Sequence, residues 1–340
     1  MNAPDKFFFQ PKYQTGVLSA PFTYFGGKSK ASELVWKLFG EVSNYVEPFA
    51  GSAAMLLAAP SPVAVETLND FDGFISNFWR SISKAPEEVA YHADWPLNET
   101  DLFARHAWLV RQRESLTEKL HDPEYFDAKI AGYWVWGIAA WIGDGYCSGA
   151  GPWEWSEEMN KIVDRRRTPA HESTGLGVHR KMPRLGDTGT GINRRTNAPR
   201  YEFILGWFNT LYSRLRDVRV CSGDWSRVLS PLATTYHGVT AVFLDPPYEA
   251  GDMDYSVGGV GEGIAANVRA WCAVNGNNPK LRIVLCGHDG EHDELCALGW
   301  TKHHWKAGPG YANPGGNFQD ETVWASPACL QPEAAQSSLF

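Results

Sequence analysis

Four consecutive residues offer the clearest chemistry in this sequence. The run Asp245-Pro246-Pro247-Tyr248 directly follows the apolar segment 239–244, and ligands of open α/β sheets bind at the carboxyl ends of strands. The two prolines lack an N–H, so the Asp245 carboxylate and the Pro246 carbonyl form a surface of acceptors. Such a surface suits the exocyclic amine of a nucleobase, and Tyr248 offers a ring on which a base can stack. The tetrapeptide alone is equally consistent with a turn that ends a strand.

A second run lies between a predicted strand at 44–46 and a predicted helix at 53–59. It reads Glu47-Pro48-Phe49-Ala50-Gly51, and its small residues allow the backbone to approach a polar ligand at a helix N-terminus. The full G-x-G-x-x-G dinucleotide pattern is absent. Asp70 follows nineteen residues after Gly51, where a ribose-binding acid is expected in a Rossmann-like unit. The alternative for Asp70 is the N-cap of a helix.

A third run, Tyr24-Phe25-Gly26-Gly27-Lys28-Ser29, resembles a phosphate-binding loop only in its last residues. That loop needs a glycine at position 22, which is Phe22 here, so the phosphate-loop interpretation fails. A Gly-Gly-Lys turn can still present Lys28 to a carboxylate while Tyr24 packs against a ligand. The alternative is an exposed lysine in a surface turn.

The three runs, taken together and in this order, resemble the Dam-type family of DNA adenine-N6 methyltransferases. The resemblance covers about 20–83 and 218–326, follows the α-type order of motifs and is strongest to phage- and prophage-encoded members. It implies S-adenosylmethionine as the cofactor, with Lys28 on its carboxylate, Asp70 on its ribose and Asp245 between cofactor and target. The implied cofactor-binding set is Tyr24, Gly27, Lys28, Glu47, Pro48, Phe49, Gly51, Asp70, Asp224 and Asp245, in which Asp224 would contact the cofactor adenine.

Two positions depart from the family pattern. Ala53 stands where many relatives carry a second glycine, and Tyr24 stands where some carry tryptophan. Both substitutions are compatible with the implied cofactor site.

The predicted elements give an α/β fold class. Strands at 62–65, 218–221, 239–244 and 281–286 alternate with helices at 200–215 and 261–274, which predicts a Rossmann-like, doubly wound and mostly parallel sheet. Segments 300–306 and 322–326 are expected to close it as a hairpin. We expect residues 1–83 and 201–330 to form the methyltransferase domain, 84–200 an inserted target-recognition region with helices at 102–120 and 128–141, and 331–340 a flexible tail.

The net charge of −8 conceals one strongly basic segment. Residues 161–200 hold ten basic and three acidic residues, or +7, which leaves −15 for the rest of the chain. Such a segment is a candidate contact for DNA phosphates, and the alternative is a solvated loop. The candidate contacts are Arg165, Arg166, Arg167, Arg180, Lys181, Arg194 and Arg195. The Trp- and Gly-rich stretch 134–155 is a candidate lining for base extrusion, although core packing is favoured for at least two of Trp134, Trp136 and Trp141.

The remaining features favour a cytoplasmic enzyme, in a bacterium or a phage-infected host, without membrane span or metal. No run of about 18 apolar residues is present, the N-terminus lacks a secretory pattern, and the six cysteines are scattered. His288 and His292 are spaced like a helical zinc pair, but they follow a strand and flank Gly290, so a metal site is not expected.

The C-terminal residues are similar to the short peptides by which bacterial polymerases and repair proteins dock onto the sliding clamp. Gln336 would be the anchor, and Leu339 with Phe340 would fill an apolar pocket. The alternative is an ordinary frayed terminus.

The function expected from the sequence is transfer of a methyl group from S-adenosylmethionine to N6 of a flipped-out adenine in double-stranded DNA. Alternatives are methylation of cytosine N4 or RNA adenine, and a non-catalytic DNA-binding protein on the same fold. Cytosine-N4 enzymes more often carry serine at the position of Asp245, and a Rossmann oxidoreductase would need the missing glycine pattern.

Overall fold

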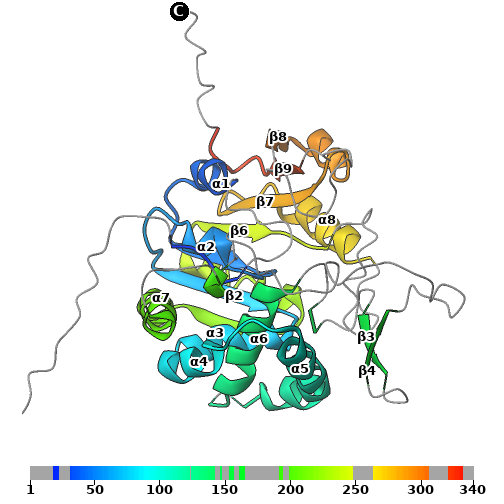
Figure 1. Cartoon of the computed structure of the whole chain (residues 1–340). Coiled ribbons are helices and arrows are strands. Elements are labelled where there is room, and N and C mark those ends of the chain that lie inside the picture. Colours follow the sequence, from blue (N-terminus) through cyan, green and yellow to red (C-terminus); the bar gives the residue numbers. More distant parts are fainter. Residues whose placement is uncertain are drawn as a thin grey trace, which may run out of the picture.

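The computed structural model describes residues 18–22, 31–122, 124–141, 146–147, 153–156, 161–164, 191–193, 199–247, 263–305 and 321–331. Its centre is a seven-stranded sheet in the order β5-β2-β1-β6-β7-β9-β8 (Figure 1). The strands are β1 (Asn44–Glu47), β2 (Val65–Asp70), β5 (Arg219–Ser222), β6 (Thr240–Leu244), β7 (Leu281–His288), β8 (Thr301–Trp305) and β9 (Glu321–Ala325). All neighbours are parallel except β9, which runs antiparallel to β7 and β8. The α/β class and the C-terminal hairpin are confirmed.

The helices are α1 (Ser32–Phe39), α2 (Ala54–Leu57), α3 (Gly73–Ile82), α4 (Pro86–Ala93), α5 (Glu99–Lys119), α6 (Ala128–Ala140), α7 (Arg200–Leu215) and α8 (Ile264–Asn275). Short 3₁₀ turns follow at η4 (Gly191–Asn193), η5 (Trp225–Val228), η6 (Thr235–His237) and η8 (Asp293–Leu298). Three helices begin at a side chain that accepts a backbone N–H, namely Asp72, Asn98 and Asp127. These caps satisfy N–H groups that a helix leaves without partners. No helix of the described residues is long and apolar enough to span a membrane.

Side chains of successive strand residues point to opposite faces of the sheet, and both faces are covered. One face packs in a cluster with α1, α2 and α3, and the other packs with α8, as Figure 1 also shows for α1, α2 and α8. The first face carries Tyr45, Ala241, Phe243, Val284, Cys286, Val323 and Ala325. The second carries Val46, Val242, Leu244, Ile283, Leu285 and Trp324. Burial on both faces explains why β1 and β6 are continuously buried.

The chain order places a topological switch point between β1 and β6. From β1 the chain continues to β2 on one side, whereas β6 lies on the other side. The parallel strands β1, β2, β5, β6 and β7 therefore end at one common edge, which we call the carboxyl edge. Crevices at such switch points are where open α/β sheets bind their ligands.

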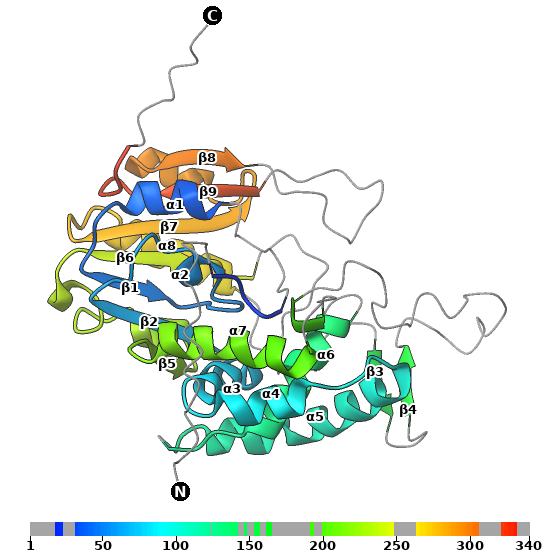
Figure 2. The ribbon, with the colours of Figure 1, turned by 60° about the vertical axis from the view of Figure 1, so that its left-hand side comes forward.

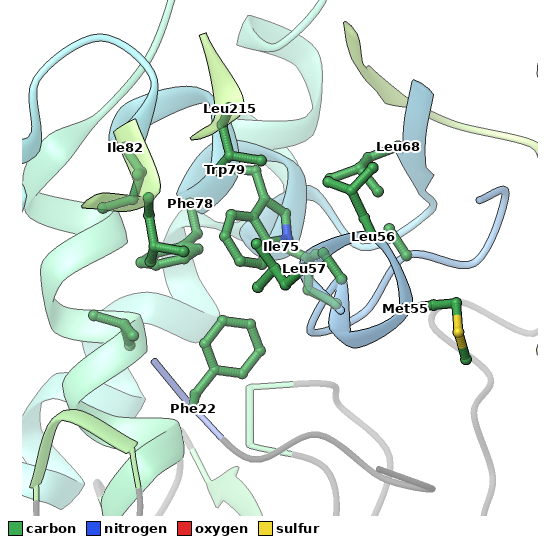
Figure 3. Close-up of a cluster of buried hydrophobic side chains, with 14 of the residues drawn as sticks. Phe22, Met55, Leu56, Leu57, Leu68, Ile75, Phe78, Trp79, Ile82 and Leu215 are labelled. Atoms are coloured by element: carbon green, nitrogen blue, oxygen red, sulfur yellow. The ribbon is translucent and has the colours of Figure 1, made fainter. Parts of the chain in front are cut away.

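The helices of the predicted inserted region continue the core of the sheet domain. Helix α6 packs against α3, α4 and α5, and α4 packs against α7, so that these helices lie beyond the β5 side of the sheet (Figure 1). Figure 3 shows where this core meets the sheet, with Trp79 and Ile75 of α3 beside Leu215 of α7 and Leu68 of β2. The division of the chain at residues 83 and 200 stays a prediction.

Two local expectations need correction. Strand β2 begins at Val65 rather than at residue 62, because the Val63 N–H is taken by the Glu66 side chain at 3.0 Å and not by a neighbouring strand. The region 84–200, for which only helices were predicted, also contains an antiparallel hairpin of β3 (Trp153–Ser156) and β4 (Lys161–Asp164).

Candidate active site

Three carboxyl groups meet at the carboxyl edge, each from the end of a different strand. Glu47 ends β1, Asp70 ends β2, and Asp245 directly follows β6. Burial raises the pKa of Glu47 to about 8, and the charges of Asp245 and Asp70 add to this increase. The two aspartates are therefore close enough to Glu47 to act on its ionisation. Glu47 and Asp245 come from two of the three predicted runs, and Asp70 is the acid predicted nineteen residues after Gly51.

Glu47 is only 2% exposed, and its carboxyl group joins β1 to the following helix. Its Oε2 accepts a hydrogen bond from the Tyr45 hydroxyl at 2.8 Å and another from the Leu56 N–H at 3.3 Å. Tyr45 lies two residues earlier on the strand and thus on the same face. Glu47 consequently fixes the geometry of the segment between β1 and α2.

The loop of residues 48–53 is held by hydrogen bonds from two neighbouring elements. Ala50 donates its N–H to the Asn69 carbonyl at 2.9 Å, and the Trp79 indole donates to the Gly51 carbonyl at 3.1 Å. Gly51 has φ +46° and Ala53 has φ +50°, a left-handed conformation that glycine adopts readily and other residues adopt at a cost. The second glycine of the family pattern is thus replaced by an alanine that keeps the glycine-like conformation.

Asp70 connects this loop to the end of β2. Its Oδ2 accepts the Gly51 N–H and its Oδ1 accepts the Asp72 N–H, both at 2.8 Å. Burial raises the pKa of Asp70 to about 7, and the nearby charge of Asp72 adds to the increase. Each carboxylate oxygen can accept a further hydrogen bond. The alternative of Asp70 as a helix cap is wrong, because Asp72 accepts the Phe74 N–H at 2.9 Å and caps α3.

Two aromatic side chains from the loops after β1 and β5 face each other in a near-parallel arrangement. The rings of Phe49 and Trp225 have centroids 6.1 Å apart and an interplanar angle of 25°. Phe71, the residue after Asp70, is 48% exposed. Asp224 lies beside Trp225 and is exposed, and its Oδ1 accepts the Ser226 N–H at 2.9 Å. Asp224 therefore begins the turn that positions Trp225.

Sequence reasoning missed Asn69, which joins three loops of the site. Asn69 is 1% exposed, and its amide donates to the carbonyls of Pro48 and Gly223, each at 3.0 Å. These acceptors lie 21 and 154 residues away in sequence. Trp79, Trp225 and Phe71 were missed as well. The only available signal was the position of Asn69 and Phe71 beside Asp70.

The other predicted site residues divide into two groups. Asp245 and Pro247 are half-buried and Pro246 is buried. The following lie outside the described residues: Tyr24, Gly27, Lys28, Tyr248, the seven candidate DNA contacts between Arg165 and Arg195, and Gln336, Leu339 and Phe340 of the tail. Trp134 and Trp136 are fully buried, which confirms core packing for two of the three tryptophans considered.

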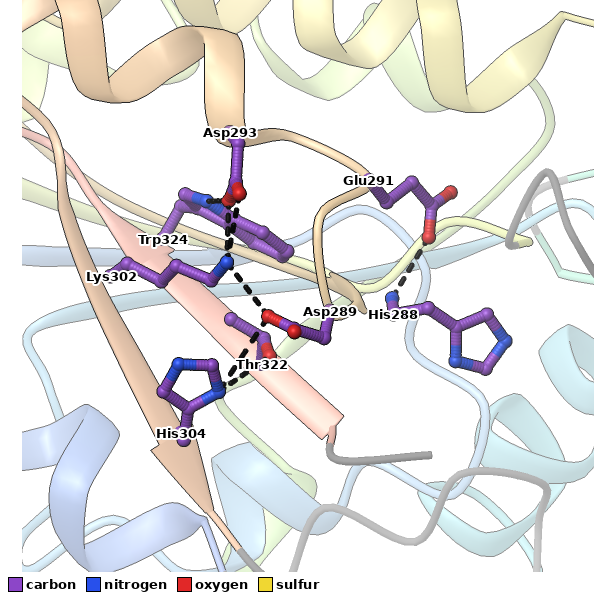
Figure 4. A network of polar contacts seen from close by, with 8 residues as sticks. All are labelled: His288, Asp289, Glu291, Asp293, Lys302, His304, Thr322 and Trp324. Atoms are coloured by element: carbon purple, nitrogen blue, oxygen red, sulfur yellow. Dashed lines mark hydrogen bonds and ion pairs between the residues drawn. The ribbon is translucent and has the colours of Figure 1, made fainter. Parts of the chain in front are cut away.

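Residues 288–292 take part in a network of polar contacts between β7, β8 and β9 (Figure 4). Lys302 bridges Asp289 and Asp293, each at 2.7 Å. His292 is fully buried against Trp324, with Nε2 3.3 Å from the Cys286 carbonyl oxygen. Within the described part of the chain, no three metal-ligating side chains gather.

Comparison with known families fits this geometry. Residues 24–131, about a third of the chain, match the family model of the D12 class N6 adenine-specific DNA methyltransferases. The chain therefore carries a segment similar to the D12 class, which is consistent with the Dam-type adenine methyltransferases. The match supports adenine-specific DNA methylation, and it implies S-adenosylmethionine, the methyl donor of these enzymes, as the cofactor. No curated protein matches the chain.

The residues of the matched segment suit this cofactor. S-adenosylmethionine carries a sulfonium cation, a ribose and an adenine, and the methyltransferase offers acids, hydrogen-bond acceptors and aromatic rings at one edge. Glu47 and Asp70 both lie within the matched segment, and Asp245 reaches the same place from the other half of the sheet.

Proposed function

We propose that this methyltransferase binds S-adenosylmethionine at the carboxyl edge and methylates an adenine that has rotated out of the DNA duplex. The observation that carries the proposal is the convergence of Glu47, Asp70 and Asp245 from three strand ends. Three acids at one place favour a ligand with positive charge. The cofactor supplies the electrophilic methyl group, and the protein supplies orientation and electrostatics.

Asp70 and the aromatic residues would hold the nucleoside part of the cofactor. The Asp70 carboxylate keeps acceptor capacity for ribose hydroxyls. Phe49 and Trp225, with Phe71 nearby in sequence to Asp70, supply apolar faces for an adenine ring. Lys28 would reach the cofactor carboxylate, as the family resemblance implies. The backbone carbonyls and N–H groups of the 48–53 loop are fixed by Asn69, Asp70 and Trp79.

Asp245 and Pro246 would hold the target amine. The carboxylate and the proline carbonyl each accept one N–H of the amine, which favours a pyramidal nitrogen with a localised lone pair directed at the methyl group. Tyr248 would stack on the base. The base must leave the duplex to reach these groups, at a cost of about a few kcal/mol for unpairing and unstacking.

The basic segment and the tail would supply further contacts with macromolecules. Residues 165–167 and the other basic residues of segment 161–200 would bind phosphates. We also propose that Gln336, Leu339 and Phe340 dock onto a sliding clamp. A pull-down with purified clamp compares the full chain with a chain that lacks the last five residues. Equal capture of both chains, or capture of neither, rejects the docking.

The decisive test of the catalytic proposal is substitution of Asp245. We expect Asp245→Ala to lower the rate of methyl transfer to DNA by at least about 10²-fold, measured by mass spectrometry of N6-methyladenine. Thermal unfolding of the variant and its binding of S-adenosylmethionine are measured alongside to confirm the fold. Near-normal methylation by this variant would refute the assigned role, and N4-methylcytosine as the product would refute the assigned target.

A further inference from the structure

A tryptophan outside the catalytic residues is held in a fixed orientation while nearly half exposed. Trp95 lies in the connection between α4 and α5, and it is 44% exposed. Its indole Nε1 donates to Asp101 Oδ2, and its backbone carbonyl accepts a hydrogen bond from the Trp136 indole at 2.8 Å. Pro96 follows it and disfavours helical backbone at Trp95. The ring is therefore ordered at the surface without being part of the core.

One face of this ring is covered by a buried cation. The guanidinium carbon of Arg105 lies 4.9 Å from the ring centroid of Trp95, 4.0 Å from that of Tyr133 and 4.4 Å from that of Trp136. Arg105 is only 7% exposed. Cation–π attraction to three rings stabilises this buried charge. The same attraction helps to hold the Trp95 ring in its orientation. The exposed part of the Trp95 side chain therefore lies away from the ring face that the Arg105 guanidinium contacts.

The chain path places Trp95 toward the carboxyl edge. Helix α3 leaves that edge after β2, and α4 runs back, so the connection from α4 to α5 returns to the same side. Figure 2 shows this connection on the side toward which β8 points. Strand β8 is antiparallel to β9, as β7 is, and so shares the direction of the parallel strands.

Three contacts support this placement. The neighbour of Trp95 in sequence, Asp94, pairs with Arg200 at 3.3 Å, and Arg200 donates to Asn193. Residue 192 of the same turn donates its N–H to the Pro21 carbonyl at 2.8 Å, just before the Tyr24–Lys28 run. Trp95 is thereby connected to the end of the basic segment 161–200 and to Pro21, which precedes the Tyr24–Lys28 run in sequence.

We infer that Trp95 is a stacking platform for a nucleobase of the DNA substrate, outside the pocket for the methylated adenine. This inference rests on the proposed function, since it requires DNA to lie across the carboxyl edge. An ordered aromatic ring loses little conformational freedom when a base stacks on it, and every base offers a π face. The cation over one face of the ring draws π density toward itself, which suits the opposite face to an electron-rich base.

The experiment measures the dissociation constant of the full chain for a duplex that the wild-type enzyme methylates, in the presence of sinefungin as a non-reactive cofactor analogue. We expect Trp95→Ala to weaken DNA binding by about ten-fold or more, the amount typical of a lost base–aromatic stack. Trp95→Phe keeps a ring but loses the bond to Asp101, so it should stay within about three-fold of the wild type.

A matched control is available at the opposite edge of the sheet. Tyr236 is 76% exposed and lies in η6, just before β6 begins. Tyr236→Ala should leave DNA binding unchanged. The salt dependence of Trp95→Ala should match the wild type, because stacking releases no counterions, and its affinity for sinefungin should be unaltered.

Two results would overturn the inference. In the first, Trp95→Ala binds the duplex as tightly as the wild type. In the second, Trp95→Phe is as weak as Trp95→Ala and both have lowered unfolding temperatures, which would assign Trp95 a purely structural role. Failure of the proposed function is distinguishable from both, because the wild-type enzyme would then methylate no duplex at all.

Discussion

The Gly51 N–H donates to the Asp70 carboxylate over 2.8 Å, so the loop after β1 and the end of β2 form one connected unit. Burial raises the pKa of Asp70, as it does that of Glu47 on the neighbouring strand. A cationic ligand would favour the ionised forms of both acids and so lower their pKa values. In the proposed cofactor site, the acids that hold the loop together would therefore also recognise the positive charge of the cofactor.

Binding of S-adenosylmethionine should strengthen as the pH rises. The pKa of Glu47 is about 8 and that of Asp70 about 7, so both acids are largely protonated below pH 6.5 and ionise between pH 6.5 and 8.5. The sulfonium cation favours the ionised forms. We expect about a three- to ten-fold gain in affinity across this range, measured by calorimetry on the full chain.

S-adenosylhomocysteine provides the matched control, since it has the same ribose, adenine and amino acid but a neutral sulfur. Its affinity should change less with pH. Asp70→Asn and Glu47→Gln should each reduce the difference between the two ligands. Parallel pH profiles for both ligands in the wild-type enzyme would contradict the electrostatic account.

Much of the sheet could be predicted from sequence because each strand is a short apolar run. Strand β6 is buried at every residue, and the chemistry-bearing residues lie at or just after strand ends, so Glu47, Asp70 and Asp245 could be predicted as site residues without any knowledge of contacts. Helix α7 was predicted with its observed limits, because a proline precedes it and its apolar residues recur at helical spacing.

Other features could not be predicted from local sequence. Helix α3 has apolar residues at helical spacing, but nine of its ten residues are buried, with the polar Ser76, Asn77 and Ser81 among them. Asn69 bonds to Gly223 across 154 residues, and Arg105 reaches rings on α6. Such contacts depend on tertiary packing, which sequence periodicity does not encode.

Replacement of Ala53 should show, through the free energy of unfolding, that the backbone of the loop of residues 48–53 is strained. Ala53 is fully buried with φ +50°. Ala53→Gly relieves about 1 kcal/mol of left-handed strain and loses about 0.8 kcal/mol of methyl burial, so the free energy of unfolding should barely change. Ala53→Val adds a branched side chain at positive φ in a packed site and should cost about 2 kcal/mol or more.

Ala31 is the control for this pair, because it is 1% exposed with φ −80°. There Ala31→Gly relieves no strain and should cost about 1 kcal/mol. Urea unfolding measures all three variants. An equal cost for Ala53→Gly and Ala31→Gly would show that Ala53 is not strained.

Arg214 should be among the most sensitive positions for stability. Its guanidinium makes a two-point contact with Glu66 at 2.6 and 2.7 Å, and the two side chains are only 12% and 4% exposed. Arg214→Ala leaves the Glu66 carboxylate buried without its cation and should cost about 3–5 kcal/mol. Replacement of both residues, Arg214→Met with Glu66→Leu, should restore most of that loss.

The exposed pair Glu33–Lys37 serves as the control, with side chains 81% and 61% exposed. Lys37→Ala should change the free energy of unfolding by less than about 0.5 kcal/mol. If Arg214→Ala proves equally mild, the contact between α7 and β2 contributes little to the fold.

Neutralising the run of three arginines should separate DNA binding through phosphates from recognition at the carboxyl edge. If Arg165, Arg166 and Arg167 each contact a phosphate, their replacement by glutamine lowers the slope of log K against log salt by up to about 2.7, since each neutralised phosphate contributes about 0.9. Binding of all DNA sequences should weaken to a similar degree. Fluorescence anisotropy at several salt concentrations measures the slope.

The control removes three exposed lysines from the opposite side of the sheet. Lys37 lies in the last turn of α1, Lys84 follows α3, and Lys280 precedes β7. Their replacement by glutamine changes the net charge equally but leaves the carboxyl edge untouched, so the salt slope should stay as in the wild type. Equal slopes for both triple variants would mean that overall charge governs DNA binding and that residues 165–167 make no phosphate contacts. A lower slope for the arginine variant alone would assign these residues to the interface, because a phosphate contact releases counterions only where the cation meets the DNA.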